Sequence, residues 1–493
     1  VRIQPLSEVL FLTLLLSKIY FNPQAEQVSM ASALEYYSNS FGADNFYGLR
    51  LMISWFSVAV LIWLFSLSYL VWKADSKSTE NRFMAVLLIV EGIKSGFMVA
   101  DAFPYDSDWE WLWDYLWVFK IEVFFYAHTA SLLLYLSLPI YYRIEKLNFM
   151  FNPRLQQHAW YLAPLTAFVI WMSVRDMSGF YMANSAWLIC SEAGAEPTLQ
   201  IWWGSIQPFM TEAVAQIGTC TQYYEVHLVD DSTAGGLWAI ALASPLITLG
   251  ALFFIRSSMK TEKAAGREGK SRYLTSRSLY IGFLGKVSGT MLYFITLMLI
   301  IPLLNGGSMA TFADSTLWRY GEDATSLDRI KYLIWTLALL MTPLAMAFEA
   351  LMFVHAALND SVFGIDQNLR KTFRAASFTG IGALLFITAT ELMEQVLGQG
   401  LLGGVAIGVL FLGLRGPVLS VIDSMSGRLI PSSYSAEETA YLSAYDTAME
   451  DRIITTEERR LLKTLAKTYD LTDERVQELE DEYDSMLEVL EEE

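Results

Sequence analysis

The sequence predicts an all-α fold: a polytopic membrane bundle of about nine transmembrane helices, followed by a small soluble three-helix domain at the C-terminus. Of its 493 residues, 54% are hydrophobic and 17% are charged, whereas soluble domains carry about 25% charged residues. A membrane-spanning helix needs about 20 apolar residues. Nine runs reach or approach that length: 51–72, 83–103, 115–141, 159–174, 237–255, 279–304, 332–356, 375–392 and 401–414.

These runs predict helices because backbone groups cannot remain unpaired in lipid, and a closed barrel would show short alternating segments instead. Lys and Arg concentrate in every second connecting segment, with seven between Arg256 and Arg277 and none across residues 176–235. Positive residues stay on the cytoplasmic side of a cell membrane. We therefore expect a multi-pass protein of the plasma membrane with an external N-terminus and a cytoplasmic C-terminus.

The chain divides into four parts. Residues 1–33 resemble a signal peptide or form an N-terminal hydrophobic segment, and residues 34–416 form the transmembrane domain, with an external loop at 176–235. An amphipathic exit helix or linker follows at 417–432, then an acidic cytoplasmic domain at 433–493. The two cysteines, Cys190 and Cys220, lie in the external loop, where they can form a disulfide or remain free thiols.

Several ionisable residues lie inside the predicted spans, where charge is costly and usually marks function or a structural ion pair. Glu91 and Lys94 are three residues apart, so they share one helical face. A polar ligand site, a proton or ion path and an acid–base site all remain open. The candidates for ligand binding or an ion path are Glu91, Lys94, Lys120, Glu122, His128, Lys286 and Glu349.

No motif in the chain selects a chemistry. It has four histidines and neither an HExxH metal motif nor a GxSxG nucleophile turn. We therefore predict no metal site, no cofactor and no catalytic residue, and expect that the protein is not an enzyme. A membrane-embedded enzyme acting on lipid stays open as an alternative.

The segment 353–373, FVHAALNDSVFGIDQNLRKTF, resembles a connector in the seven-helix sensor regions of histidine kinases. The segment 417–430, PVLSVIDSMSGRLI, resembles the exit helix of the same family. The resemblance implies a sensory membrane region whose exit helix passes a signal onward. The kinase itself is absent, since the residues after Pro431 contain no phospho-accepting histidine motif. The apolar face of the exit helix suits lipid contact or pairing in a homodimer.

The tail, residues 433–493, has 19 acidic and six basic residues, a net charge of −13. We expect three short helices. Thr455 or Thr456 caps the second helix, with Glu458 three residues after Thr455 as in a capping box, and Thr472 caps the last helix. The tail resembles small TerB-like or degenerate EF-hand-like domains. Ala448 stands where calcium would need an oxygen ligand, so a protein-interaction module is favoured over a calcium sensor. Its acidity argues against nucleic acid binding.

Together these features favour a membrane sensory or signal-relay protein that couples an external or intramembrane stimulus to a cytoplasmic effector. The alternative is a transporter or ion-translocating protein that uses the intramembrane Glu and Lys residues. A transporter is expected to show internal repeats, and the sequence shows no convincing one. A scaffold or assembly subunit is also open.

Overall fold

The fold is known from a computed structural model. It describes residues 46–103, 123–142, 144–174, 186–190, 193–201, 218–220, 225–229, 235–264, 271–304, 325–358, 365–397, 400–429, 435–449 and 454–492, with a few isolated positions between them.

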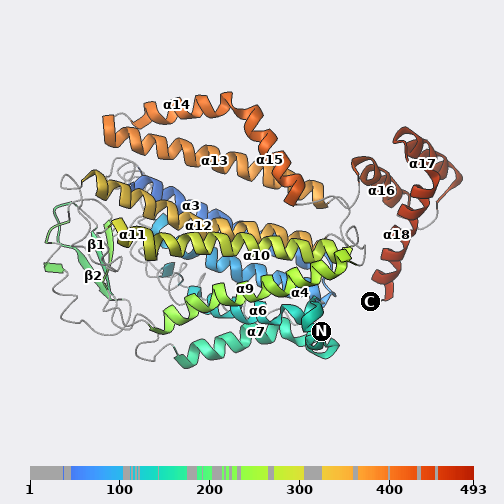
Figure 1. The fold of residues 1–493 in the computed structure, drawn as a ribbon, viewed down its shortest axis with the longest axis horizontal. Coiled ribbons are helices and arrows are strands. Elements are labelled where there is room, and N and C mark those ends of the chain that lie inside the picture. The colour runs from blue at the N-terminus through green and yellow to red at the C-terminus, as the bar shows by residue number, and fades with distance from the viewer. Residues whose placement is uncertain are drawn as a thin grey trace, which may run out of the picture.

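The main body is a bundle of long helices that lie roughly side by side (Figure 1). Asp75 and Ser78 set the boundary between its first two helices. The Asp75 carboxylate accepts hydrogen bonds from the backbone N–H groups of Lys77 and Ser78, and the Ser78 hydroxyl caps the second helix. The bundle helices are α3 Tyr47–Ala74, α4 Thr79–Ser95, α6 Phe124–Tyr141, α7 Pro153–Val174, α9 Gly235–Ala264, α10 Ser271–Ile295, α11 Ile301–Leu304 and α12 Ser326–Leu358.

Short helical turns extend several of these helices. They are the 3-10 turns Gly96–Met98 and Ala100–Ala102 after α4, the 3-10 segment Glu145–Met150 before α7, and the π turn Thr296–Ile300 between α10 and α11. Each of the nine apolar runs of the sequence overlaps a helix of the described residues.

Four helices of the described residues are long and apolar enough to cross a membrane: 48–74, 124–141, 273–295 and 326–358. The number rises to five if helices α14 Gly400–Gly413 and α15 Arg415–Leu429, which are bent by 65° relative to each other, count as one broken span. The chain is thus a helical membrane protein. The count of nine spans and the orientation of the termini stay predictions.

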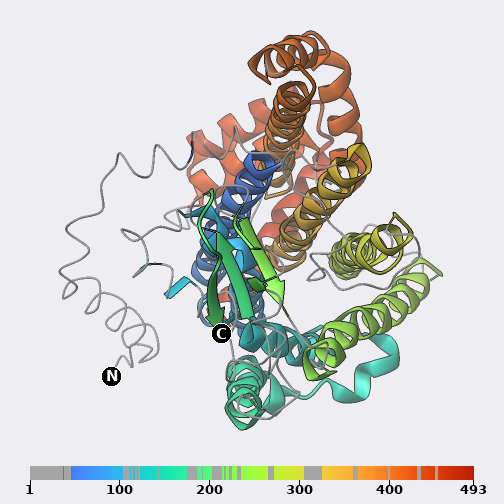
Figure 2. The same ribbon diagram turned by 90° about the vertical axis from the view of Figure 1, so that its left-hand side faces the viewer.

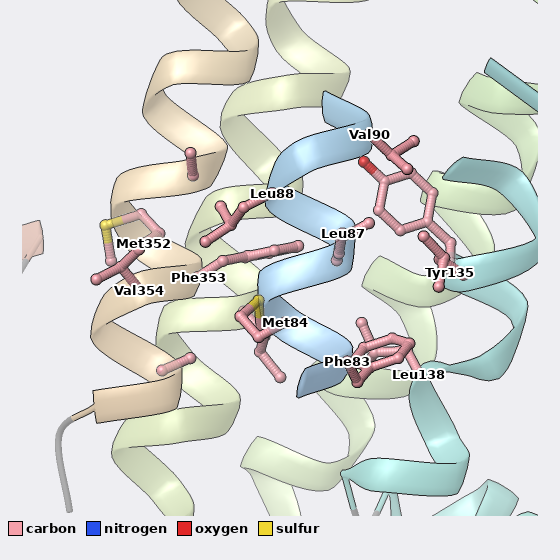
Figure 3. Packing of buried hydrophobic residues seen from close by; sticks show 14 of the residues in the cluster. Phe83, Met84, Leu87, Leu88, Val90, Tyr135, Leu138, Met352, Phe353 and Val354 are labelled. Atoms are coloured by element: carbon pink, nitrogen blue, oxygen red, sulfur yellow. The ribbon is translucent and has the colours of Figure 1, made fainter. Parts of the chain in front are cut away.

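Helix α4 lies at the centre of the bundle and contacts α3, α6, α7 and α12. Figure 3 shows α4 between α12 and α6: Leu88 lies near Phe353 of α12, and Phe83 lies near Leu138 of α6. These side chains belong to one buried hydrophobic cluster that joins the bundle helices. The face of α4 that packs against these helices can carry polar groups only where other helices satisfy them.

A three-stranded antiparallel sheet lies at one end of the bundle (Figure 2). Its strands are β1 Ala186–Cys190, β2 Thr198–Ile201 and β3 Glu225–Val229, in the order β2-β1-β3. The sheet falls inside the loop predicted at 176–235, so the all-α prediction holds for the helical body and misses this element. Cys220 is disulfide-bonded. Cys190, the one other cysteine of the chain, ends β1, and its side chain lies outside the described residues.

Helices α13 Ile365–Leu397, α14 Gly400–Gly413 and α15 Arg415–Leu429 form a second layer along the bundle (Figure 1). Helix α14 packs closely on α13 because it presents glycine there: a Cβ on Gly403 would lie 2.5 Å from the carbonyl oxygen of Ala389. Helix α15 returns to the first turns of α13, where Arg374 and Asp423 form an ion pair at 3.3 Å. It overlaps the segment 417–432, for which the sequence predicts an amphipathic exit helix or linker.

The C-terminal helices are α16 Ala436–Ala448, α17 Thr456–Thr468 and α18 Asp473–Glu492. As predicted, Thr455 and Glu458 form a capping box at α17, and the Thr472 hydroxyl accepts a hydrogen bond from the Arg475 backbone N–H at 3.2 Å. The three helices share a hydrophobic cluster that includes Tyr445 and Leu479. Burial and the nearby acids raise the pKa of Tyr445 to about 12, so its hydroxyl remains a donor to Asp484 at neutral pH.

Substituting Gly403 with Ala should separate α13 from α14. The added methyl group overpacks the contact with Ala389, which costs about 1–3 kcal/mol. Gly380 of α13 is the matched control, since nothing lies within 4 Å of a Cβ built there. The Gly380→Ala variant should be neutral or stabilised by up to about 1 kcal/mol. Unfolding of the full chain in mixed micelles measures the stability of both variants. Equal stability changes in Gly403→Ala and Gly380→Ala would contradict the close contact between α13 and α14.

Substituting Leu479 with Ala should loosen α16–α18. Leu479 is fully buried, and removing such a side chain costs about 2–5 kcal/mol. Leu461 is 69% exposed on α17, so Leu461→Ala should change stability by no more than about 0.5 kcal/mol. Hydrogen exchange of the α16–α18 amides in the full chain distinguishes the Leu479→Ala variant from the Leu461→Ala variant. Equal protection in both variants would show that the cluster does not stabilise these helices.

Candidate functional site

Four charged side chains from three helices meet inside the bundle. Lys286 of α10 is the centre: its Nζ lies 2.7 Å from Oε2 of Glu91 on α4 and 2.8 Å from Oε2 of Glu349 on α12. On α4, Lys94 Nζ lies 3.1 Å from Oε1 of Glu91. The Glu91–Lys94 pair predicted from the three-residue spacing is confirmed. We call Glu91, Lys94, Lys286 and Glu349, with Ser131 and Tyr135, the buried ion network.

Helix α6 adds the two hydroxyl groups of the network. The Tyr135 hydroxyl lies 2.7 Å from Glu91 Oε1 and 2.8 Å from Glu349 Oε1, and it also accepts a hydrogen bond from Lys286. Ser131 donates to Glu91 Oε1 at 2.5 Å and accepts from Lys94 Nζ at 3.0 Å. A phenol carries a single hydrogen, so Tyr135 donates to one carboxylate at a time while bridging both.

Glycine residues on α10 make this geometry accessible. A Cβ on Gly285 would overlap the ring of Phe348, and one on Gly289 would lie 2.6 Å from Cβ of Ala345. Both neighbours belong to α12, so small residues let α10 and α12 approach closely, as such residues do in membrane bundles. Lys286, between these two glycines in sequence, can therefore reach Glu349.

The network is closed to solvent. Glu349 is fully buried, and Glu91, Lys94 and Lys286 are 1–3% exposed. Phe283 closes one side: its ring centroid lies 5.2 Å from that of Tyr135 and 5.0 Å from that of Phe353. Two carboxylates face two ammonium groups, so the formal charges cancel. Removing one member of a buried pair costs about 3–5 kcal/mol, because it leaves an uncompensated charge.

Three residues predicted for the site remain: Lys120, Glu122 and His128. Lys120 and Glu122 lie outside the described residues. His128 is on α6, where its ring centroid lies 5.9 Å from that of Phe124. Sequence reasoning missed Ser131 and Tyr135, which are uncharged in a run of apolar residues. Their four-residue spacing places both hydroxyl groups on one face of a helix. That spacing was the sequence signal that could have identified them as site residues.

The N-terminal half of α10 and the C-terminal half of α12 share a second polar contact. Ser278 of α10 and Nδ1 of His355 on α12 are 2.6 Å apart and fully buried. His355 is six residues after Glu349 on the same helix. Helix α12 is therefore joined to α10 both at the network and near its C-terminal end.

The arrangement offers charge, hydrogen bonds and proton-bearing groups, without a metal site among the described residues. No family model, curated protein or solved structure matches the chain. The network therefore has to be interpreted from its own geometry.

Substituting Lys286 with Met should destabilise the protein by about 3–5 kcal/mol, because two carboxylates would then share one remaining ammonium group. Adding Glu349→Gln restores neutrality, so the double variant should lose less than the sum of the single losses, by about 0.5–3 kcal/mol. Denaturation in mixed micelles measures the stability of the two single variants and of the double variant.

The matched control is Lys73→Met. Lys73 is an exposed lysine at the end of α3, and this change should stay within about 0.5 kcal/mol. If the stability loss of the double variant equals the sum of the losses in Lys286→Met and Glu349→Gln, a shared network is contradicted.

Proposed function

We propose that this chain is a membrane sensory or signal-relay protein in which the buried ion network is the element that a stimulus rearranges. The proposal includes nine spans in the plasma membrane, a cleaved or retained hydrophobic N-terminal segment, an external N-terminus and a cytoplasmic acidic tail. The observation that carries it is the position of α12. This helix holds Glu349 in the network and ends at Leu358, with only residues 359–364 before α13 begins.

The proposed path from α12 to the tail runs through α13 and α15. Arg374, in the early turns of α13, pairs with Asp423 of α15, and α15 ends at Leu429, a few residues before α16. A shift of α12 would thus move α13, α15 and the α16–α18 helices in turn. In this proposal the α16–α18 helices form a soluble domain that docks a cytoplasmic effector.

A buried set of paired charges suits a switch because packed interiors and interfaces are bistable rather than continuously deformable. Breaking one contact of the network is costly, so its rearranged form must be satisfied by another set of contacts. Exposed Val421 and Met425 on α15 provide an apolar face for lipid or for a second copy of the chain.

Ion or proton translocation is the second candidate, favoured by one observation. The Tyr135 hydroxyl bridges Glu91 and Glu349, so a proton could pass between two carboxylates through a phenol. Against it, the four charged members are at most 3% exposed, and a translocation path must reach both sides.

The relay proposal predicts that a change inside the network alters the position of α15 relative to α12. Spin labels at Leu344→Cys on α12 and Val421→Cys on α15, which are 45% and 60% exposed, report the distance between the two helices. Glu349→Gln should shift this distance by about 1–2 Å or more, the scale of helix movements in switching proteins.

Glu262→Gln, a buried acid on α9 outside the network, is the matched control and should leave the distance unchanged. An unchanged distance in Glu349→Gln would contradict the relay. Proton flux into liposomes that contain the full chain, lost in Glu349→Gln, would instead establish the translocation candidate.

A further inference from the structure

We propose that Arg82, held between Trp72 and Trp160, binds the phosphodiester headgroup of an anionic membrane lipid. The three residues come from α4, α3 and α7, at the end of the bundle where α3 ends and α4 and α7 begin. The proposal goes beyond the relay function and does not depend on it, because it requires only that the bundle lies in a membrane.

The guanidinium group of Arg82 is fixed from two directions. Its Nε donates to the backbone carbonyl of Ser76 at 2.9 Å. Its Cζ lies 5.9 Å from the ring centroid of Trp72 and 5.9 Å from that of Trp160. The two indoles themselves contact edge to face, with centroids 5.9 Å apart at an interplanar angle of 72°. A cation positioned over aromatic faces in this way is stabilised by about 0.5–1 kcal/mol at an exposed site.

The outer edge of this guanidinium group is available. Arg82 is half-buried, and within the part of the chain that the structure describes it has no carboxylate partner. Because Nε is occupied by Ser76, the two terminal amino groups remain as a planar fork. Such a fork matches two oxygens of one phosphate and forms shorter, stronger hydrogen bonds than neutral donors do.

A lipid fits this place better than a soluble phosphate. The last turns of α3 expose Tyr69 and Leu70, 66% and 43% accessible, and α7 exposes Leu162 and Leu165, 42% and 54% accessible. These apolar surfaces suit acyl chains, and tryptophan is enriched at headgroup level. Exposed Lys73 follows Trp72 directly, which favours an anionic over a zwitterionic lipid.

Native mass spectrometry of the full chain, titrated with phosphatidylglycerol or with phosphatidylcholine of the same acyl chains, tests the site. Wild-type protein should prefer phosphatidylglycerol. The Arg82→Gln variant should lose about tenfold in affinity for phosphatidylglycerol, the equivalent of one charge-assisted hydrogen bond, and should lose most of the preference over phosphatidylcholine. Arg82→Lys keeps the positive charge but lacks the planar fork. Its affinity for phosphatidylglycerol should therefore fall between that of the wild type and that of Arg82→Gln.

A second variant keeps the test valid if Arg82→Gln folds poorly. Trp160→Leu leaves the charge and removes one aromatic wall, and should weaken phosphatidylglycerol binding by about two- to fivefold. Arg154→Gln is the matched control, since Arg154 is exposed in the first turn of α7; it should change affinity by less than about twofold.

Three results would overturn the proposal. Equal losses in Arg154→Gln and Arg82→Gln would indicate diffuse attraction by surface charge. Equal affinity of the wild-type protein for the two lipids would exclude selection of an anionic headgroup. Full competition by glycerol phosphate, which has no acyl chains, would identify a site for a soluble phosphate.

Discussion

The structure depends on the balance of charge inside the bundle. Two carboxylates and two ammonium groups are buried together, and Lys286 contacts both acids. Each charge alone would be too costly at this depth, and only their mutual contacts and the hydroxyls of Ser131 and Tyr135 make burial tolerable. Helices α4, α6, α10 and α12 must therefore keep a single register relative to one another.

This constraint accounts for features that hydropathy alone would misread. Helix α4 has only 17 residues and carries Glu91 and Lys94, so it is not among the helices that meet the length and composition requirements of a span. It nevertheless lies at the centre of the bundle. Its charges are satisfied by neighbouring helices rather than by water, which is the condition under which an interior membrane helix can be polar.

The sequence predicted the helical body and part of the network, for identifiable reasons. Glu91 and Lys94 follow from local spacing, because residues three apart on a helix face the same side. Lys286 and Glu349 were predicted as site residues from their charge within apolar runs. That they meet Glu91 could not be predicted, because contacts between helices distant in sequence depend on packing. The close approach of α10 and α12 at Gly285 and Gly289, which brings Lys286 to Glu349, is likewise visible only in the structure.

Other features were beyond sequence reasoning for different reasons. Strands β1–β3 are four or five residues long, too short to stand out by periodicity in the segment predicted as an external loop. Ser131 and Tyr135 carry no charge that would draw attention within an apolar run. By contrast, capping signals are local, and Thr455 with Glu458 marked the start of α17 correctly.

The most direct test of the account asks whether water reaches the network. Ser131→Cys places a thiol beside Glu91 at a fully buried position, and Arg460→Cys provides an exposed reference on α17. A membrane-impermeant thiol reagent, applied to the purified protein in lipid nanodiscs, should label the α17 thiol readily and leave the thiol at position 131 unmodified. Comparable labelling rates at the two positions would show a hydrated cavity in place of a closed set of paired charges.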